Sequence, residues 1–205
     1  SARLPNGFPF SSVVMNFPEP KRPGLSPLVV RIKTDQLTYE EHPESDTYDG
    51  EAVVVARYKD ANGGIVHKDS QQYHFSGKLA DLANARKGEI LFYREPILKP
   101  GTYTVEVADT DTYGPRSSAR VSTIEVPRET GNDLRVSSLV LIGKLERATE
   151  AKDAGASPLY AGDVLIYPSG GEPFSRTADK QLGVFYTVYP GAGFAAPEAT
   201  LELHR

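Results

Sequence analysis

Histidine is the first residue type in this 205-residue chain that could bind a metal or act in acid–base chemistry. No two of its histidines are two or four residues apart, the spacings that bring imidazoles together on one element. His67 and His74 fall on one expected strand and are an odd number of residues apart, so their side chains face opposite sides of that strand. We therefore predict solvated or half-buried side chains at His42, His67, His74 and His204.

Acidic residues gather in two places, and the second of these along the chain is a candidate calcium site. Asp109 and Asp111 stand in an expected loop over residues 109–115, where they could supply the first oxygens of a calcium site. The loop lacks the further acidic and glycine positions of an EF-hand, and aspartate also caps turns without a metal. We predict no metal here beyond that pair. The other group is a solvated run of Glu40, Glu41, Glu44, Asp46 and Asp49.

Nucleophilic and phosphate-binding patterns are missing from the sequence. There is no cysteine, which excludes disulfides, zinc fingers and cysteine nucleophiles, and no Gly-x-Ser-x-Gly motif. The glycine pairs at 63–64, 170–171 and 191–193 open no helix and carry no Lys-Ser/Thr, so we expect turns. We predict no catalytic residue, no cofactor and no enzyme activity. A pair of catalytic carboxylates stays open, because spacing alone nominates none.

Net charge, apolar run length and aromatic content exclude further classes of binding partner. Lysine and arginine number 23 against 27 aspartate and glutamate, a net charge of −4 without a basic stripe, so nucleic acid is not an expected ligand. The longest apolar run, residues 52–56, is far too short to cross a membrane. Eleven tyrosines without tryptophan leave a sugar-binding platform as an alternative, although most should pack in a core.

The elements that would position these residues are strands. Apolar and polar residues alternate with period two, and the signals between them are turns, above all Asn62-Gly63. One short helix is expected around Leu79 and Leu82, ended by Gly88. The expected strands cover 28–33, 52–58, 65–75, 90–93, 101–107, 119–126, 134–145, 162–168, 182–189 and 199–204.

A proline-glycine turn near the middle of the chain carries the most specific pattern. Leu98, Pro100, Gly101 and Tyr103 precede an alternating strand and resemble the tyrosine corner of immunoglobulin- and fibronectin-like sandwiches. In that corner a tyrosine hydroxyl bonds back to nearby backbone. We therefore expect an all-β fold of two consecutive sandwiches of this kind with one short helix.

Domain boundaries follow from proline, charge and a partial internal repeat. Residues 1–27 are expected as a proline-rich linker or strap that docks in part, and 28–127 as the first sandwich. Polar residues 128–133 form the linker to a second β domain, 134–205. Its last part resembles residues 53–75 in layout but lacks the closing strands, which predicts an incomplete sheet whose unpaired edge can pair with another chain. Alternatively, it completes itself by packing on the first domain.

Several motifs together are similar to the C-terminal region of bacterial von Willebrand factor A-related proteins. They lie at 85–96, 100–105, 134–141, 162–168 and 185–190. The resemblance implies an exported, extracytoplasmic protein with an A-type domain N-terminal to this region, but that domain's Asp-x-Ser-x-Ser metal motif is absent here. It implies a spacer or protein-interaction module whose partner is another protein or the A-type domain. A carbohydrate-binding sandwich and a hydrolase with an unrecognised site are the alternatives.

Overall fold

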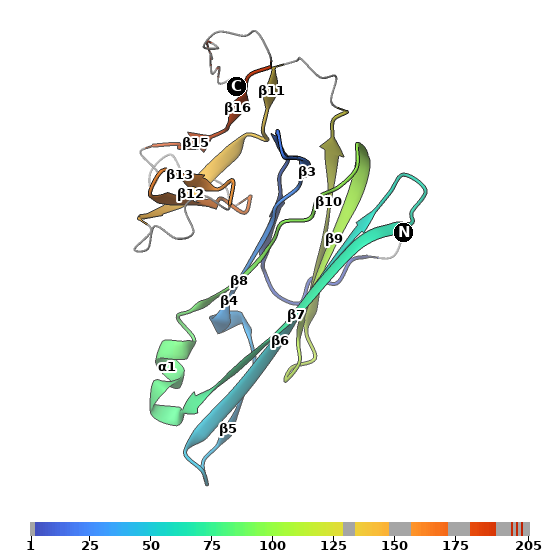
Figure 1. Cartoon of the computed structure of the whole chain (residues 1–205). Helices are drawn as coiled ribbons and strands as arrows, with labels where there is room; N and C mark the ends of the chain where they lie inside the picture. The colour runs from blue at the N-terminus through green and yellow to red at the C-terminus, as the bar shows by residue number, and fades with distance from the viewer. Residues whose placement is uncertain are drawn as a thin grey trace.

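The protein is seen in a computed structural model that describes residues 3–128, 134–147, 157–171, 181–191, 198, 200 and 202. Strands dominate it, with a single α-helix in the described part of the chain, α1 (Leu82–Ala85), preceded by a 3-10 turn η2 (Leu79–Asp81). The predicted all-β class with one short helix is confirmed. Figure 1 shows three layers: the long strands of one sheet, a short sheet beside them, and a second β unit outside it.

The larger sheet, sheet A, has the order β10-β9-β6-β5, with β7 on the other side of β6. Its strands are antiparallel and long because residues with period two present one apolar row to the core, as Ala52, Val54 and Ala56 do on β6. The strands are β5 (Tyr39–His42), β6 (Thr47–Lys59), β7 (Ile65–Lys78), β9 (Gly101–Asp111) and β10 (Ser117–Val126).

The hairpin between β6 and β7 turns where the sequence predicts it. Asp60 accepts the backbone N–H groups of Asn62 and Gly64 at 2.9 Å each, and Gly63 takes a φ of +82°, which favours glycine. Within the described residues β7 pairs only with β6, and an edge position suits the Gln, His and Lys residues of this strand.

The smaller sheet, sheet B, consists of β1 (Ser11–Val14), β4 (Leu28–Lys33) and β8 (Glu89–Arg94) in the order β1-β4-β8. Its inner face packs against sheet A through Leu28, Val30 and Phe92. The first core also takes in Tyr39, Tyr48, Tyr58, Tyr103, Val105 and Val107 from sheet A. The two sheets form the first sandwich.

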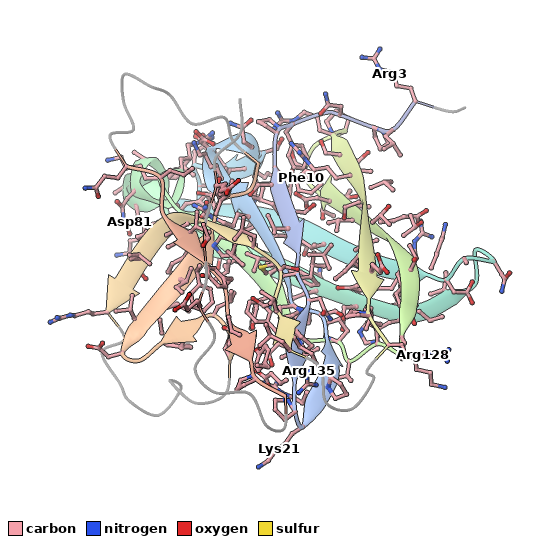
Figure 2. All side chains as sticks on the ribbon, turned by 90° about the horizontal axis from the view of Figure 1, so that it is seen from above. Arg3, Phe10, Lys21, Asp81, Arg128 and Arg135 are labelled. Atoms are coloured by element: carbon pink, nitrogen blue, oxygen red, sulfur yellow. The ribbon has the colours of Figure 1, made fainter. Side chains whose placement is uncertain are left out.

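The N-terminal stretch does more than strap the sandwich. Residues 5–8 pair with β10, since Gly7 N–H donates to the Ser117 carbonyl and Ala119 N–H to the Pro5 carbonyl, both at 2.9 Å. After Pro9 the chain moves to sheet B as β1, and Phe8 and Phe10 are buried in the core. Figure 2 shows Phe10 inside the molecule beside β1, whereas Arg3 and Lys21 point outward. The strands β2 (Phe17–Glu19) and β3 (Arg22–Leu25) then form a hairpin.

The tyrosine-corner residues lie on the connection that carries the chain from β8 in sheet B to β9 in sheet A. Tyr103 is buried, and its hydroxyl donates to the Lys99 carbonyl at 2.8 Å. Leu98 is buried as well, and its N–H donates to the Gly24 carbonyl. The hydrogen bond that the sequence pattern requires is therefore present, and it joins the start of β9 to the connection that precedes it.

The second β unit packs on the outer face of sheet B (Figure 1). Its main sheet has the order β13-β14-β12-β15, and β11 pairs with β16 beside it. The strands are β11 (Arg135–Val136), β12 (Val140–Arg147), β13 (Tyr160–Ala161), β14 (Val164–Pro168), β15 (Val184–Phe185) and β16 (Val188–Tyr189). A second core joins Val140, Leu159 and Ile166 to Met15, Phe17, Leu25 and Val29.

Some expectations fall outside the described residues or need correction. Most of the linker 128–133 and of the expected strand 199–204 lies outside the described residues. The expected loop 109–115 was wrong at its start, because strand β9 continues to Asp111: Asp109 pairs with both β6 and β10, and Asp111 pairs with β6. The short strands β1, β2, β3, β5 and β13 were not predicted, since each is too short or too proline-rich to show a period of two.

Among the described residues no helix is long and apolar enough to span a membrane.

Candidate functional site

A cleft of about 320 Å³ opens where the second β unit meets the outer face of sheet B. We call it the joint cleft. Val29, Leu91 and Tyr93 supply one wall from β4 and β8, and the other wall consists of residues 157, 159–160 and 165–168. Apolar side chains predominate on both walls, which suits the burial of an apolar or aromatic group.

Sheet B presents this wall because both of its faces are apolar. On β4, Leu28 and Val30 point into the first core while Val29 points into the second. On β8 the alternation puts Phe92 inside and Leu91 and Tyr93 outside. The second unit covers Val29 fully, but Leu91 keeps an exposed fraction of 41% at the mouth of the cleft.

A chain of polar groups closes one end of the joint cleft. Arg22 Nη1 lies 2.8 Å from Glu95 Oε2, Tyr93 donates its hydroxyl to the other oxygen of Glu95, and Ser157 Oγ lies 2.7 Å from the Tyr93 oxygen. Burial, followed by the hydrogen bond to Glu95, raises the pKa of Tyr93. The phenol therefore stays neutral, and because its own proton is donated to Glu95, its oxygen accepts a hydrogen bond from the Ser157 hydroxyl.

Two further tyrosines line the opposite wall. The Tyr167 hydroxyl donates to Glu146 Oε2 at 2.7 Å, and burial followed by this hydrogen bond raises the pKa of Tyr167 to about 12. Contact with Lys144, and then with Tyr167, lowers the pKa of Glu146, so this carboxylate stays ionised. Tyr160 from β13 lies in the same wall. The cleft thus combines apolar walls with tyrosine hydroxyls held by carboxylates.

The structure places Asp109 and Asp111 away from this cleft, on the inner face of β9. Both side chains have an exposed fraction of 0%. Asp111 Oδ2 accepts the N–H and hydroxyl of Thr38 at 3.0 and 2.7 Å and lies 3.5 Å from Arg116. Since a guanidinium already stands beside Asp111, the pair does not resemble an open calcium loop. Calcium binding there stays a prediction without geometric support.

Asp109 is the more unusual of the two. No described residue donates a hydrogen bond of ordinary geometry to either of its carboxylate oxygens, and its cross-strand neighbours are Val54 and Ser118. Burial raises the pKa of Asp109 to about 7; the Thr110 backbone offsets this in part, and the nearby Asp111 adds to it. This carboxyl group therefore takes up a proton near neutral pH.

The histidines show what spacing in the sequence misses. Asp49 on β6 stands between His42 of β5 and His74 of β7, with an imidazole Nε2 3.3 Å from each of its oxygens. His67 pairs with Asp69 at 2.7 Å. Within the described residues no group of three or more histidine, cysteine, aspartate or glutamate side chains is arranged to hold a metal ion.

The cleft residues themselves went unnoticed in the sequence. Tyr93, Glu95, Ser157, Tyr160 and Tyr167 come from segments up to 74 positions apart, and no motif links them. The one available signal was the uninterrupted apolar run at 28–30, because a strand that is apolar on both sides is buried on both faces.

The chain was compared with known proteins, and no family model, no curated protein and no solved structure matches it.

Proposed function

We propose that this chain is a non-catalytic, immunoglobulin-like spacer and protein-interaction module of an exported multidomain bacterial protein. One observation carries the proposal: sheet B buries apolar residues on both faces, so the two β units share it. A shared sheet couples the units as a spacer requires, and its outer face forms one wall of an apolar cleft suited to a side chain of a partner. The extracytoplasmic location and the neighbouring A-type domain rest on the resemblance alone.

The polar groups at the cleft favour binding over catalysis. Ser157 is hydrogen-bonded to a phenol rather than to a general base, because the raised pKa of Tyr93 keeps that group protonated. Glu95 is already neutralised by Arg22 at 2.8 Å. A nucleophile needs a base that can accept its proton. These contacts supply no such base; they join the second β unit to sheet B through hydrogen bonds.

A saccharide is the second candidate ligand, favoured by the gathering of Tyr93, Tyr160 and Tyr167 in one cleft. These tyrosines line a cleft between the two β units rather than an open sheet face. Four tyrosines of sheet A are not accessible to a sugar, because they are buried in the first core: Tyr39, Tyr48, Tyr58 and Tyr103.

The test places a charge at the mouth of the joint cleft. We expect the separately produced A-type domain of the same protein to bind the wild-type chain in calorimetry, and Leu91→Glu to weaken binding about tenfold or more. Leu91 is 41% exposed, so this change should leave the fold intact. Val121→Glu, at 49% exposure on the other sheet, is the matched control and should bind as the wild type does.

Four results would contradict the proposal. The A-type domain could fail to bind the wild-type chain, or both variants could bind it equally well. Ester or glycoside hydrolysis by the wild-type chain that Ser157→Ala abolishes would show an enzyme instead. Binding of neutral oligosaccharides that depends on Tyr160 and Tyr167, without binding of the A-type domain, would favour the second candidate.

A further inference from the structure

A second hollow, separate from the joint cleft, lies at the flank where sheets A and B part. We call it the flank groove; its volume is about 350 Å³. The start of β1, the end of β4, the edge strand β10 and residues 170–171 of the second unit line it. None of its lining residues belongs to the joint cleft.

Two positive charges in the flank groove are left without an acidic partner in the described part of the chain. Arg31 is not one of them, because its guanidinium makes two contacts of 3.0 Å with the Glu89 carboxylate. Asp35 accepts the side-chain amide of Gln36. Among the described residues neither Lys33 nor Arg120 forms an ion pair.

Arg120 is held in place for binding. It is paired in register with Val107, so its side chain leaves β10 on the inner side of sheet A. At the sheet edge its guanidinium lies 5.4 Å from the ring centroid of Phe10, which is buried. A guanidinium that already rests on an aromatic ring loses less conformational freedom when it binds a carboxylate.

The backbone around the groove is suited to an extended chain. In the described residues β1 pairs only with β4, so the other edge of β1 is free to form backbone hydrogen bonds. Gly170 packs so closely on Ser11 that a Cβ at this position would lie 1.9 Å from the Ser11 Cβ. Gly170 and Gly171 thus form one side of the groove, and because they have no side chains they do not occupy its volume.

We propose that the flank groove binds an acidic peptide segment, which pairs with β1 and places a carboxylate between Lys33 and Arg120. Charge complementarity selects an anionic ligand, and the free strand edge selects a peptide over a saccharide, because only a peptide can extend the sheet. This site is additional to the joint cleft and does not depend on it.

The experiment is a titration of the ¹⁵N-labelled full chain, followed by NMR. The probe is the capped peptide acetyl-Val-Glu-Val-Glu-amide, and its glutamine counterpart is the neutral comparison. We expect shifts at Ser11, Arg120, Gly170 and Gly171, binding about fivefold or more tighter for the acidic peptide, and weakening as salt rises. The double variant Lys33→Gln/Arg120→Gln should lose about fivefold or more in affinity.

The matched control is Lys68→Gln/Lys78→Gln, which removes the same charge from exposed residues of β7. Equal losses in the two double variants would overturn the proposal, because net charge alone would explain them. Equal affinity for the glutamine peptide would overturn it too. Stronger shifts from trigalacturonic acid or from sulfate would reassign the groove to a saccharide or a free anion. Arg120→Met, which keeps an aliphatic stem over Phe10, replaces Arg120→Gln if that variant unfolds.

Discussion

Asp109 is the residue at which the chain departs furthest from an ordinary sandwich. Tyr103, Val105 and Val107 on β9 point into the core, and Asp109 continues their row with a carboxyl group. Among the described residues neither of its oxygens has a hydrogen-bond partner of ordinary geometry. Burying such a group costs several kcal/mol if it is charged, so the protein holds it protonated near neutral pH. Its contribution to stability must therefore depend on pH.

We expect the free energy of unfolding to fall between about pH 4 and pH 7. The pKa of Asp109 is raised from 3.8 to about 7 in the folded chain, so in this range folding takes up a proton and rising pH opposes it. The loss should amount to about 2–4 kcal/mol. Asp109→Asn should remove most of it and raise stability at about pH 8.

Urea unfolding at about pH 5 and pH 8 measures this effect. Asp163→Asn serves as the control, because it removes a carboxylate whose side chain is 73% exposed. If the wild type and Asp109→Asn lose the same stability over this range, another group governs the pH dependence.

At the scale of elements, the crossover from β8 to β9 decides how the two sheets join. The Tyr103 hydroxyl bonds to the Lys99 carbonyl at 2.8 Å and fixes the turn that precedes β9. Tyr103→Phe should therefore lower the free energy of unfolding by about 1 kcal/mol. Tyr113→Phe, at a tyrosine that is 39% exposed, should change it by less than about 0.5 kcal/mol. Chemical denaturation measures both free energies of unfolding. Equal stability of the two variants would show that the Tyr103 hydrogen bond does not stabilise the fold.

At the scale of the whole molecule, the shared sheet B should make the two β units unfold together. Ile166→Ala removes a buried side chain from the second core and should cost about 2–4 kcal/mol. We expect calorimetry to show one transition, shifted to lower temperature as a whole. Leu145→Ala, at a side chain 54% exposed, should leave it almost unchanged. A separate early transition, with the remainder unmoved, would show that the units unfold independently and would weaken the spacer proposal.

The sequence by itself determined the class of the fold and much of its local structure. Strand periodicity, the Asn62-Gly63 turn and the short helix all depend on contacts between near neighbours, which spacing records directly. The tyrosine corner is equally local, since its hydrogen bond spans four residues. These features were predictable for that reason.

Only the tertiary structure decided where chemistry can occur. The joint cleft brings Tyr93 together with Ser157, and the flank groove brings Arg120 to Phe10, across distances in sequence that no motif records. The burial of Asp109 had the same origin: the pattern suggested a solvated loop, but pairing with β6 and β10 extended the strand and turned the carboxyl inward. Local propensity fixes strands, whereas the packing of one sheet against two neighbours fixes which side chains meet, because that packing depends on the whole chain at once.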